Sequence, residues 1–113
     1  MKMVVAFINP DKLWEVKKAL YELGAPGISV GQVMGIGKSL ARMGQPGEGM
    51  GIPKFFPKMR LETVVEDSAL PKVLDLLREV CNTDTPGDGK VFVLPVEDAL
   101  RIRTNERGED AIL

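Results

Sequence analysis

The amino-acid sequence predicts an α+β domain in which two helices cover one face of a four-stranded antiparallel sheet. Three observations predict it: short apolar runs typical of strands, two segments with helical spacing of apolar residues, and one long glycine- and proline-rich stretch between the two halves. The chain has 113 residues, of which 44% are hydrophobic and 27% charged, values ordinary for one globular domain. We therefore expect residues 1–113 to form a single domain.

The first half of the chain predicts a strand, a helix and a second strand. Residues 3–8 form an apolar run typical of a strand buried on both faces. Asn9 and Pro10 then provide a capping residue and a proline suited to the first helical turn. Apolar residues of the helix recur at spacings of three and four, at Leu13, Val16, Leu20 and Leu23. Gly24 ends this helix, and residues 27–34 predict the second strand. Trp14 fits either the core or an interface, and we expect it to pack partly buried.

The second half repeats this order. Residues 59–65 alternate apolar and polar side chains, as a strand with two different faces does. Asp67 and Ser68 predict a helix start, and the helix that follows carries one apolar stripe: Leu70, Val73, Leu74, Leu77, Val80 and Cys81. Residues 82–89 predict a turn and residues 90–94 a fourth strand. For the C-terminal segment, residues 100–113, we expect a short edge strand over 100–104 after one helical turn at 95–99, and then a loose tail.

The order β-α-β-loop-β-α-β is that of a ferredoxin-like split βαβ fold. Two helices can cover only one face of the sheet, whereas the predicted strands carry apolar residues on both faces. An open apolar face favours association between copies of the chain.

Composition excludes several classes of function. The net charge of −1 argues against bulk attraction to nucleic acid or anionic membranes. The chain has no histidine and one cysteine, which excludes histidine-based catalytic triads, histidine zinc sites and an intrachain disulfide. Its N-terminal apolar run is too short for a signal peptide or a membrane span, so we expect a cytoplasmic protein.

Residues 35–58 form the stretch around which the two halves are arranged. The stretch holds six of the twelve glycines and three prolines, so neither a helix nor a strand is expected there. A solvated linker is one interpretation. Basic and adaptable apolar side chains indicate instead a loop that docks onto a partner, through Arg42, Met43, Met50, Lys54 and Phe55.

Two glycine-containing segments beside strands indicate phosphate binding. Residues 35–39 (GIGKS) resemble a Walker A loop, but the first glycine of that motif would have to stand at Gln32 and no amphipathic helix follows Ser39. Without a Walker A loop, this segment still offers exposed backbone N–H groups beside a cation. Such groups are typical of an anion site and equally of an ordinary turn. Cations at the predicted strand ends can gather a polyphosphate: Lys38, Lys58, Lys90, Arg101 and Arg103. Lacking a general base, this is expected to be a binding site and not a catalytic one.

Several separated motifs then match one family in register. They are Thr83 followed by residues 87–93 (GDGKVFV), residues 101–104 (RIRT), the ending 109–112 (EDAI), residues 35–38 (GIGK) and residues 56–58 (FPK). Along nearly all its length the chain resembles the PII nitrogen-regulatory signal-transduction proteins.

This resemblance implies a ferredoxin-like homotrimer that binds ATP or ADP in the clefts between subunits and is not an enzyme. The implied phosphate-binding residues are Gly87, Asp88, Gly89, Lys90, Arg101 and Arg103 from one subunit, and Gly35, Ile36, Gly37 and Lys38 from the other. Residues implied near the base and sugar are Phe7, Ser29, Glu62 and Val64. Residues 82–90 become the nucleotide-binding turn and residues 35–58 the family's T-loop, which would contact a target protein, either a membrane transporter or a metabolic enzyme.

The resemblance also implies a site for Mg²⁺ and 2-oxoglutarate at Ser39 and Lys58. The family has glutamine where this chain has Ser39, and the shorter hydroxyl would need a water molecule to reach the ion. Gly51 replaces the family's modified tyrosine and Gly49 a phosphoserine, so the usual modifications of the loop are excluded. Alternatives are a trimer that binds a metal or another small ligand, and a weak ATPase with Asp88 or Glu62 as base. Single-stranded RNA binding would need paired aromatics that the chain lacks.

Overall fold

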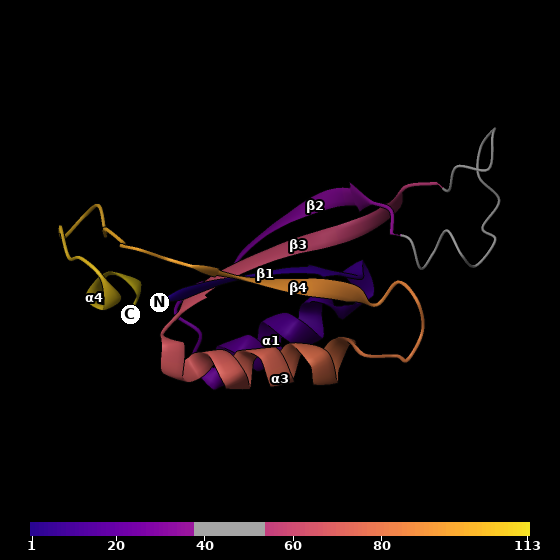
Figure 1. The fold of residues 1–113 in the computed structure, drawn as a ribbon, viewed down its shortest axis with the longest axis horizontal. Coiled ribbons are helices and arrows are strands. Elements are labelled where there is room, and N and C mark those ends of the chain that lie inside the picture. Colours follow the sequence, from indigo (N-terminus) through magenta and orange to yellow (C-terminus); the bar gives the residue numbers. More distant parts are fainter. Residues whose placement is uncertain (38–53) are drawn as a thin grey trace.

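The computed structural model of the protein describes residues 1–37 and 54–113. Four strands and three helices, with two 3-10 turns, make up this described part (Figure 1). In chain order they are β1 (Lys2–Ile8), η1 (Pro10–Lys12), α1 (Leu13–Leu23), β2 (Ser29–Gly35), β3 (Phe56–Val65), η2 (Asp67–Ala69), α3 (Leu70–Cys81), β4 (Gly89–Pro95) and α4 (Glu109–Ile112).

The strands form one antiparallel sheet in the order β2-β3-β1-β4. Figure 1 shows α1 and α3 side by side under one face of this sheet. In the central pair, Lys2 of β1 lies opposite Val65 of β3 and Ile8 lies opposite Met59. The predicted ferredoxin-like fold is therefore confirmed, with both long helices on the same face of the sheet (Figure 1).

The hydrophobic core lies between the sheet and the two long helices. It consists of the apolar residues that the periodicities predicted, including Val4, Ala6, Ile8, Leu61 and Val65 from the strands and Val16, Leu20, Val73, Leu77 and Cys81 from the helices. Each fully buried leucine or valine stabilises the fold by about 1.5–3 kcal/mol. Thr63 is also buried, and its hydroxyl donates a hydrogen bond to the carbonyl oxygen of Gly27 at 2.7 Å. Burial raises the pKa of the Cys81 thiol, as expected for a cysteine that packs as a small apolar side chain.

Helix α1 ends where the sequence predicted, but both predicted helix caps are wrong. Gly24 is left-handed, with a φ of 90°, and its N–H reaches the carbonyl oxygens of Leu20 and Tyr21. Asn9 does not cap its helix, because its side chain accepts a hydrogen bond from Lys58. Asp67 likewise makes no cap, since its carboxylate lies 3.0 Å from the N-terminal amine.

Strands β2 and β3 extend further into the central stretch than predicted. Gly35 pairs with Phe56, and Met34 pairs with Pro57, so both ends of residues 35–58 belong to strands. Pro57 is tolerated because β1 pairs with β3 only as far as Met59, which leaves Pro57 with a strand neighbour on one side only. The residues between β2 and β3 therefore begin and end directly at paired strands.

The C-terminal segment differs most from its prediction. No helical turn forms at 95–99, and residues 101–104 are a turn instead of an edge strand. The N–H of Asn105 donates to the carbonyl oxygen of Arg101 at 2.8 Å, with Asn105 in the left-handed region, where asparagine is tolerated. A bridge between Leu100 and Arg107 closes this turn, and α4 follows, so the tail is ordered and not loose.

Candidate ligand-binding site

A cavity of about 530 Å³ lies at one end of the sheet, which we call the loop-end cavity. The end of β2, the turn between α3 and β4, and the first residues of β4 surround it. Its volume is within the range of small-ligand sites. The residues of the predicted nucleotide and 2-oxoglutarate sites that line it are Phe7, Gly35, Ile36, Gly37, Lys58, Gly87, Asp88, Gly89 and Lys90.

Lys58 joins three parts of this cavity. From β3, its Nζ donates one hydrogen bond to Asn9 Oδ1 at 2.5 Å and another to the carbonyl oxygen of Gly87 at 2.5 Å. Burial of the ammonium lowers the pKa of Lys58, and the nearby carboxylates of Asp88 and Asp11 partly oppose this shift. Lys58 therefore fixes the turn against the end of β1, and an anion that uses this ammonium must compete with both oxygens.

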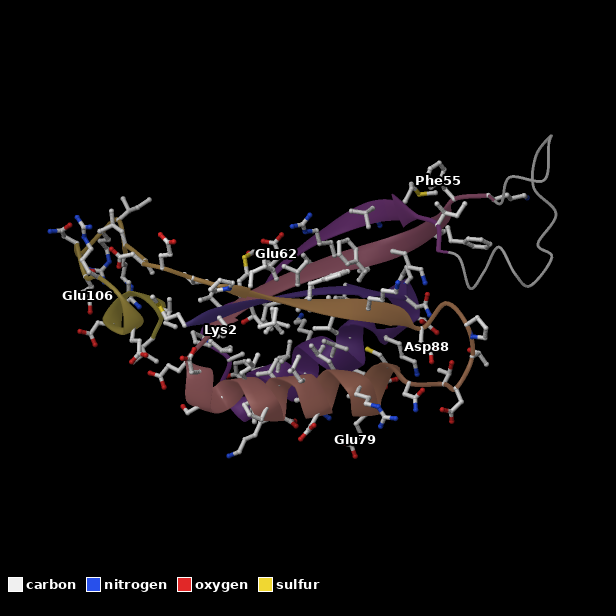
Figure 2. The ribbon with its side chains drawn as sticks, in the orientation of Figure 1. Lys2, Phe55, Glu62, Glu79, Asp88 and Glu106 are labelled. Atoms are coloured by element: carbon white, nitrogen blue, oxygen red, sulfur yellow. The ribbon has the colours of Figure 1, made fainter. Side chains whose placement is uncertain are left out.

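Asp88 organises the turn from within (Figure 2). Its carboxylate accepts hydrogen bonds from the Thr83 hydroxyl at 2.5 Å and from the Thr83 N–H at 2.7 Å. The Thr83 hydroxyl is the main reason that the pKa of Asp88 lies below its ordinary value. A carboxylate with a lowered pKa is a poor general base. The hydrogen bonds to Thr83 therefore favour a structural role for Asp88 and argue against Asp88 as the base of the weak-ATPase alternative.

Glycine is required where this turn meets the sheet. Gly87 and Gly89 both have positive φ angles, 95° and 114°. A Cβ atom on Gly89 would lie 1.9 Å from the carbonyl oxygen of Phe7. The turn can therefore approach β1 only because Gly89 has no side chain. Phe92, three residues further along β4, packs edge-on against Phe7 with 6.1 Å between the ring centroids.

A second, smaller cavity of about 250 Å³ holds other predicted residues. Ser29, Glu62 and Val64 line it, together with Ile112 of α4. Ser29 lies opposite Glu62 in the sheet, and Glu62 Oε1 forms an ion pair with Arg60 Nε at 2.7 Å. Figure 2 labels Glu62 well apart from Asp88. Within one chain, the predicted base and sugar residues are thus divided, with Phe7 in the loop-end cavity and the other three here.

The two predicted phosphate-binding arginines lie at the far end of β4 from the turn. Strand β4 begins at Gly89 and ends at Pro95, and Arg101 and Arg103 follow it (Figure 1). Arg101 donates to the carbonyl oxygen of Leu113 and forms a 3.4 Å ion pair with Glu106, whereas Arg103 is exposed in the turn. Within one chain, Gly35–Gly37 therefore lie with Gly87–Lys90, and the two arginines do not. Which subunit supplies each group to a shared site stays a prediction.

Some predicted residues lie outside the described part of the chain: Lys38, Ser39, Arg42, Met43 and Met50. Lys54 and Phe55 are described and exposed, and they directly precede β3 (Figure 2). From the sequence we missed Asn9, which we expected as a helix cap, and Phe92, which we placed in the GDGKVFV motif and in a strand without giving it a role at the site. Among the described residues, no three histidine, cysteine, aspartate or glutamate side chains gather as a metal site. No described helix has the length and apolarity needed to cross a membrane.

The fold and the cavity define the class: a ferredoxin-like domain whose ligand-sized cavity adjoins the connection between two paired strands. A family model described as nitrogen regulatory protein P-II matches residues 1–106. The chain belongs to this family, as its motifs predicted, and thereby to a group of signal-transduction regulators.

Individual relatives match over almost the whole chain. The nitrogen regulatory protein P-II of Azospirillum brasilense is 41% identical over 112 residues, covering 99% of this chain and 100% of the relative. That of Rhodospirillum rubrum is 40% identical with the same coverage. The nitrogen regulatory protein GlnK2 of Haloferax mediterranei is 42% identical over 113 residues, covering 99% of this chain and 91% of the relative. These relatives are named as regulatory proteins and not as enzymes.

Proposed function

We propose that this protein is a non-enzymatic regulator that binds ATP and ADP in competition and controls a target protein through residues 35–58. One observation carries the proposal: the base of this connection, Gly35–Gly37, lines the same cavity as the glycine turn Gly87–Lys90. A ligand in the cavity therefore contacts both the turn and the start of the connection.

The cavity offers the chemistry that a polyphosphate requires. Lys58 and Lys90 supply cations, and the glycines allow a close approach of phosphate oxygens to the backbone. Phe7 and Phe92 give the opposite wall an apolar surface for a purine. We expect the phosphates to lie on the turn and the base to lie toward these rings.

The site is complete only when a second copy supplies its other part. Ser29, Glu62 and Val64, with Arg101 and Arg103, lie away from the loop-end cavity of their own chain. The helix-free face of the sheet carries exposed apolar side chains, among them Phe92 at 52% and Leu94 at 45%. Burying this face in a homotrimer would remove it from water and bring the arginines of one copy toward the turn of the next.

ATP and ADP would control the connection through their different phosphate contacts. A ligand shifts the balance between two states of residues 35–58 only by the difference in its affinity for them. The target would be a membrane transporter or a metabolic enzyme in nitrogen regulation, and the protein would act in the cytoplasm or at a transporter on the membrane. Mg²⁺ and 2-oxoglutarate at Ser39 and Lys58 would add a second input, in competition with Asn9 and Gly87 for the Lys58 ammonium.

Calorimetry with ATP and ADP tests the binding step. Lys90→Ala and Arg103→Ala should each weaken ATP by about 1.5–3 kcal/mol, the scale of a hydrogen bond to a charged group. Lys72→Ala on the exposed face of α3 is the control and should leave affinity unchanged. Absence of micromolar binding in the intact protein would refute the proposal, and unchanged affinity in both variants would remove these residues from the site.

A pull-down with and without ATP tests the control step. Intact protein should retain its target in a nucleotide-dependent manner, whereas a variant lacking residues 37–55 should not. The same variant should still form the sheet, because β2 and β3 stay paired up to Met34 and Pro57 and the three residues left between them suffice for a hairpin loop. A target that the deletion variant retains would place the contact elsewhere on the protein.

A further inference from the structure

A groove of about 710 Å³ lies between α1 and the segment that leads into β2, which we call the α1 groove. Its walls are formed by one face of α1 and by residues 25–28 with Val30. None of its lining residues is shared with the loop-end cavity. A ligand of the α1 groove would therefore share no contact residue with a ligand in the loop-end cavity.

Two large aromatic side chains stand exposed along this groove. Trp14 is 66% exposed and Tyr21 is 81% exposed, so the prediction that Trp14 packs partly buried is wrong. They lie seven positions apart, on the same face of α1. Val30 of β2, 51% exposed, faces the groove from its other wall. Tryptophan and tyrosine are the side chains most often found at the energetic centres of protein interfaces.

The charge of the groove has one sign. Lys17 and Lys18 line it between the two aromatic residues, and no carboxylate belongs to its lining. Lys18 Nζ lies 5.6 Å from the centroid of the Trp14 ring, within cation–π distance. This patch is positive although the whole chain carries a net charge of −1. Its charge complement is therefore an acidic group beside an apolar one.

We propose that the α1 groove docks an acidic segment of a partner protein that carries an aromatic or large apolar side chain. The apolar side chain would lie between Trp14, Tyr21 and Val30, and the carboxylates would pair with Lys17 and Lys18. A concave groove fits a protruding segment, whereas a flat lipid surface would leave its floor uncovered. This gives the protein a second contact surface, separate from residues 35–58.

The test uses the full-length protein and a displayed library of random peptides of about twelve residues. Recovered peptides should be rich in aspartate and glutamate around one aromatic or aliphatic residue. Trp14 is the only tryptophan of the chain, so its fluorescence should shift to shorter wavelength as each synthetic peptide binds. The Lys17→Glu/Lys18→Glu double variant should weaken binding by about tenfold or more. Lys72→Glu/Arg78→Glu, which changes two exposed cations of α3, should not.

Three outcomes would overturn the proposal. Peptides without acidic bias, or binding that the Lys17→Glu/Lys18→Glu variant leaves unchanged, would remove the charge argument. A fluorescence shift with phosphatidylglycerol vesicles but with no recovered peptide would make the groove a lipid contact. A higher oligomer that Trp14→Ala dissociates would show that a second copy of the chain covers it. Circular dichroism of each variant shows whether it is folded. The ATP affinity of the same variants, measured by calorimetry, should equal that of the intact protein.

Discussion

Gly89, at the start of β4, is the residue of the loop-end cavity where one added methyl group should have the largest effect. In the Gly89→Ala variant the new Cβ would lie 1.9 Å from the carbonyl oxygen of Phe7 and 3.0 Å from its carbonyl carbon. Ordinary contacts begin near 3.4 Å, so the two backbones would have to separate by the difference, about 1.5 Å. Both atoms belong to the backbone of β1, the central strand, and cannot turn aside as the end of a side chain can.

Two costs add up in this variant. The φ of 114° at Gly89 lies in a region that is strained for alanine, which costs about 1–3 kcal/mol. Separating the strands also breaks the pairing of Gly89 with Ile8, and a lost backbone hydrogen bond costs about 0.5–1.5 kcal/mol. We therefore expect Gly89→Ala to lower the free energy of unfolding by about 2–4 kcal/mol, a large share of the total stability of a domain.

Urea unfolding at fixed protein concentration measures this loss. Gly31→Ala in β2 is the matched control, because a Cβ there meets nothing within 4 Å and φ is not positive. Alanine should stabilise that position by about 0.5–1 kcal/mol. If Gly89→Ala were as stable as Gly31→Ala, the turn would not approach β1 closely, and the cavity would not depend on glycine at position 89. Calorimetry should also show weaker ATP binding in Gly89→Ala than in Gly31→Ala.

Two further predictions concern the same turn. Lys58→Met removes the ammonium that donates hydrogen bonds to Asn9 and Gly87. It should destabilise the fold by about 1–3 kcal/mol, because these partly buried partners lose charged hydrogen bonds. Urea unfolding of Lys58→Met, Asn9→Ala and the double variant should show non-additive losses of stability, and strictly additive losses would contradict the contact. Thr83→Val removes the hydroxyl that chiefly lowers the pKa of Asp88. Because that pKa is lowered on folding, the Asp88 contribution is present above its ordinary value of 3.8 and is lost as pH falls through the folded value. Thermal unfolding between about pH 6 and pH 2 should therefore show a smaller acid-induced loss in Thr83→Val than in the parent, and equal losses would contradict the role of the hydroxyl.

The elements that the sequence predicted correctly are those specified by local patterns. The apolar stripes of α1 and α3 and the alternation in β3 recur within a few residues, and the core they form is the one expected. Gly24 ended its helix as predicted, because the left-handed conformation is a local preference of glycine.

What the sequence did not predict depends on contacts between residues far apart in the chain. Asn9 has the composition of a cap, but its side chain is taken by Lys58, 49 positions away. Arg101 and Arg103 alternate as in a strand, yet Arg101 bonds to the C-terminal residue and folds the segment into a turn. Trp14 has the position of a packing residue, and only the tertiary arrangement leaves it exposed beside β2.

The division of the proposed nucleotide site follows from the topology of the sheet. Because β4 is an extended strand of seven residues, the turn before it and the arginines after it are held at its opposite ends. Such a separation cannot be closed by side-chain movement, so one chain can offer either the turn or the arginines to a given phosphate group. A second copy, placed so that its C-terminal segment meets the turn of the first, removes this conflict. If Arg103 contributes to ATP affinity as we propose, it does so across an interface, and mixing Lys90→Ala subunits with Arg103→Ala subunits should restore some intact sites. No recovery of affinity in such mixed trimers, with subunit exchange verified by mass, would show that both residues act within one chain or that neither binds the nucleotide.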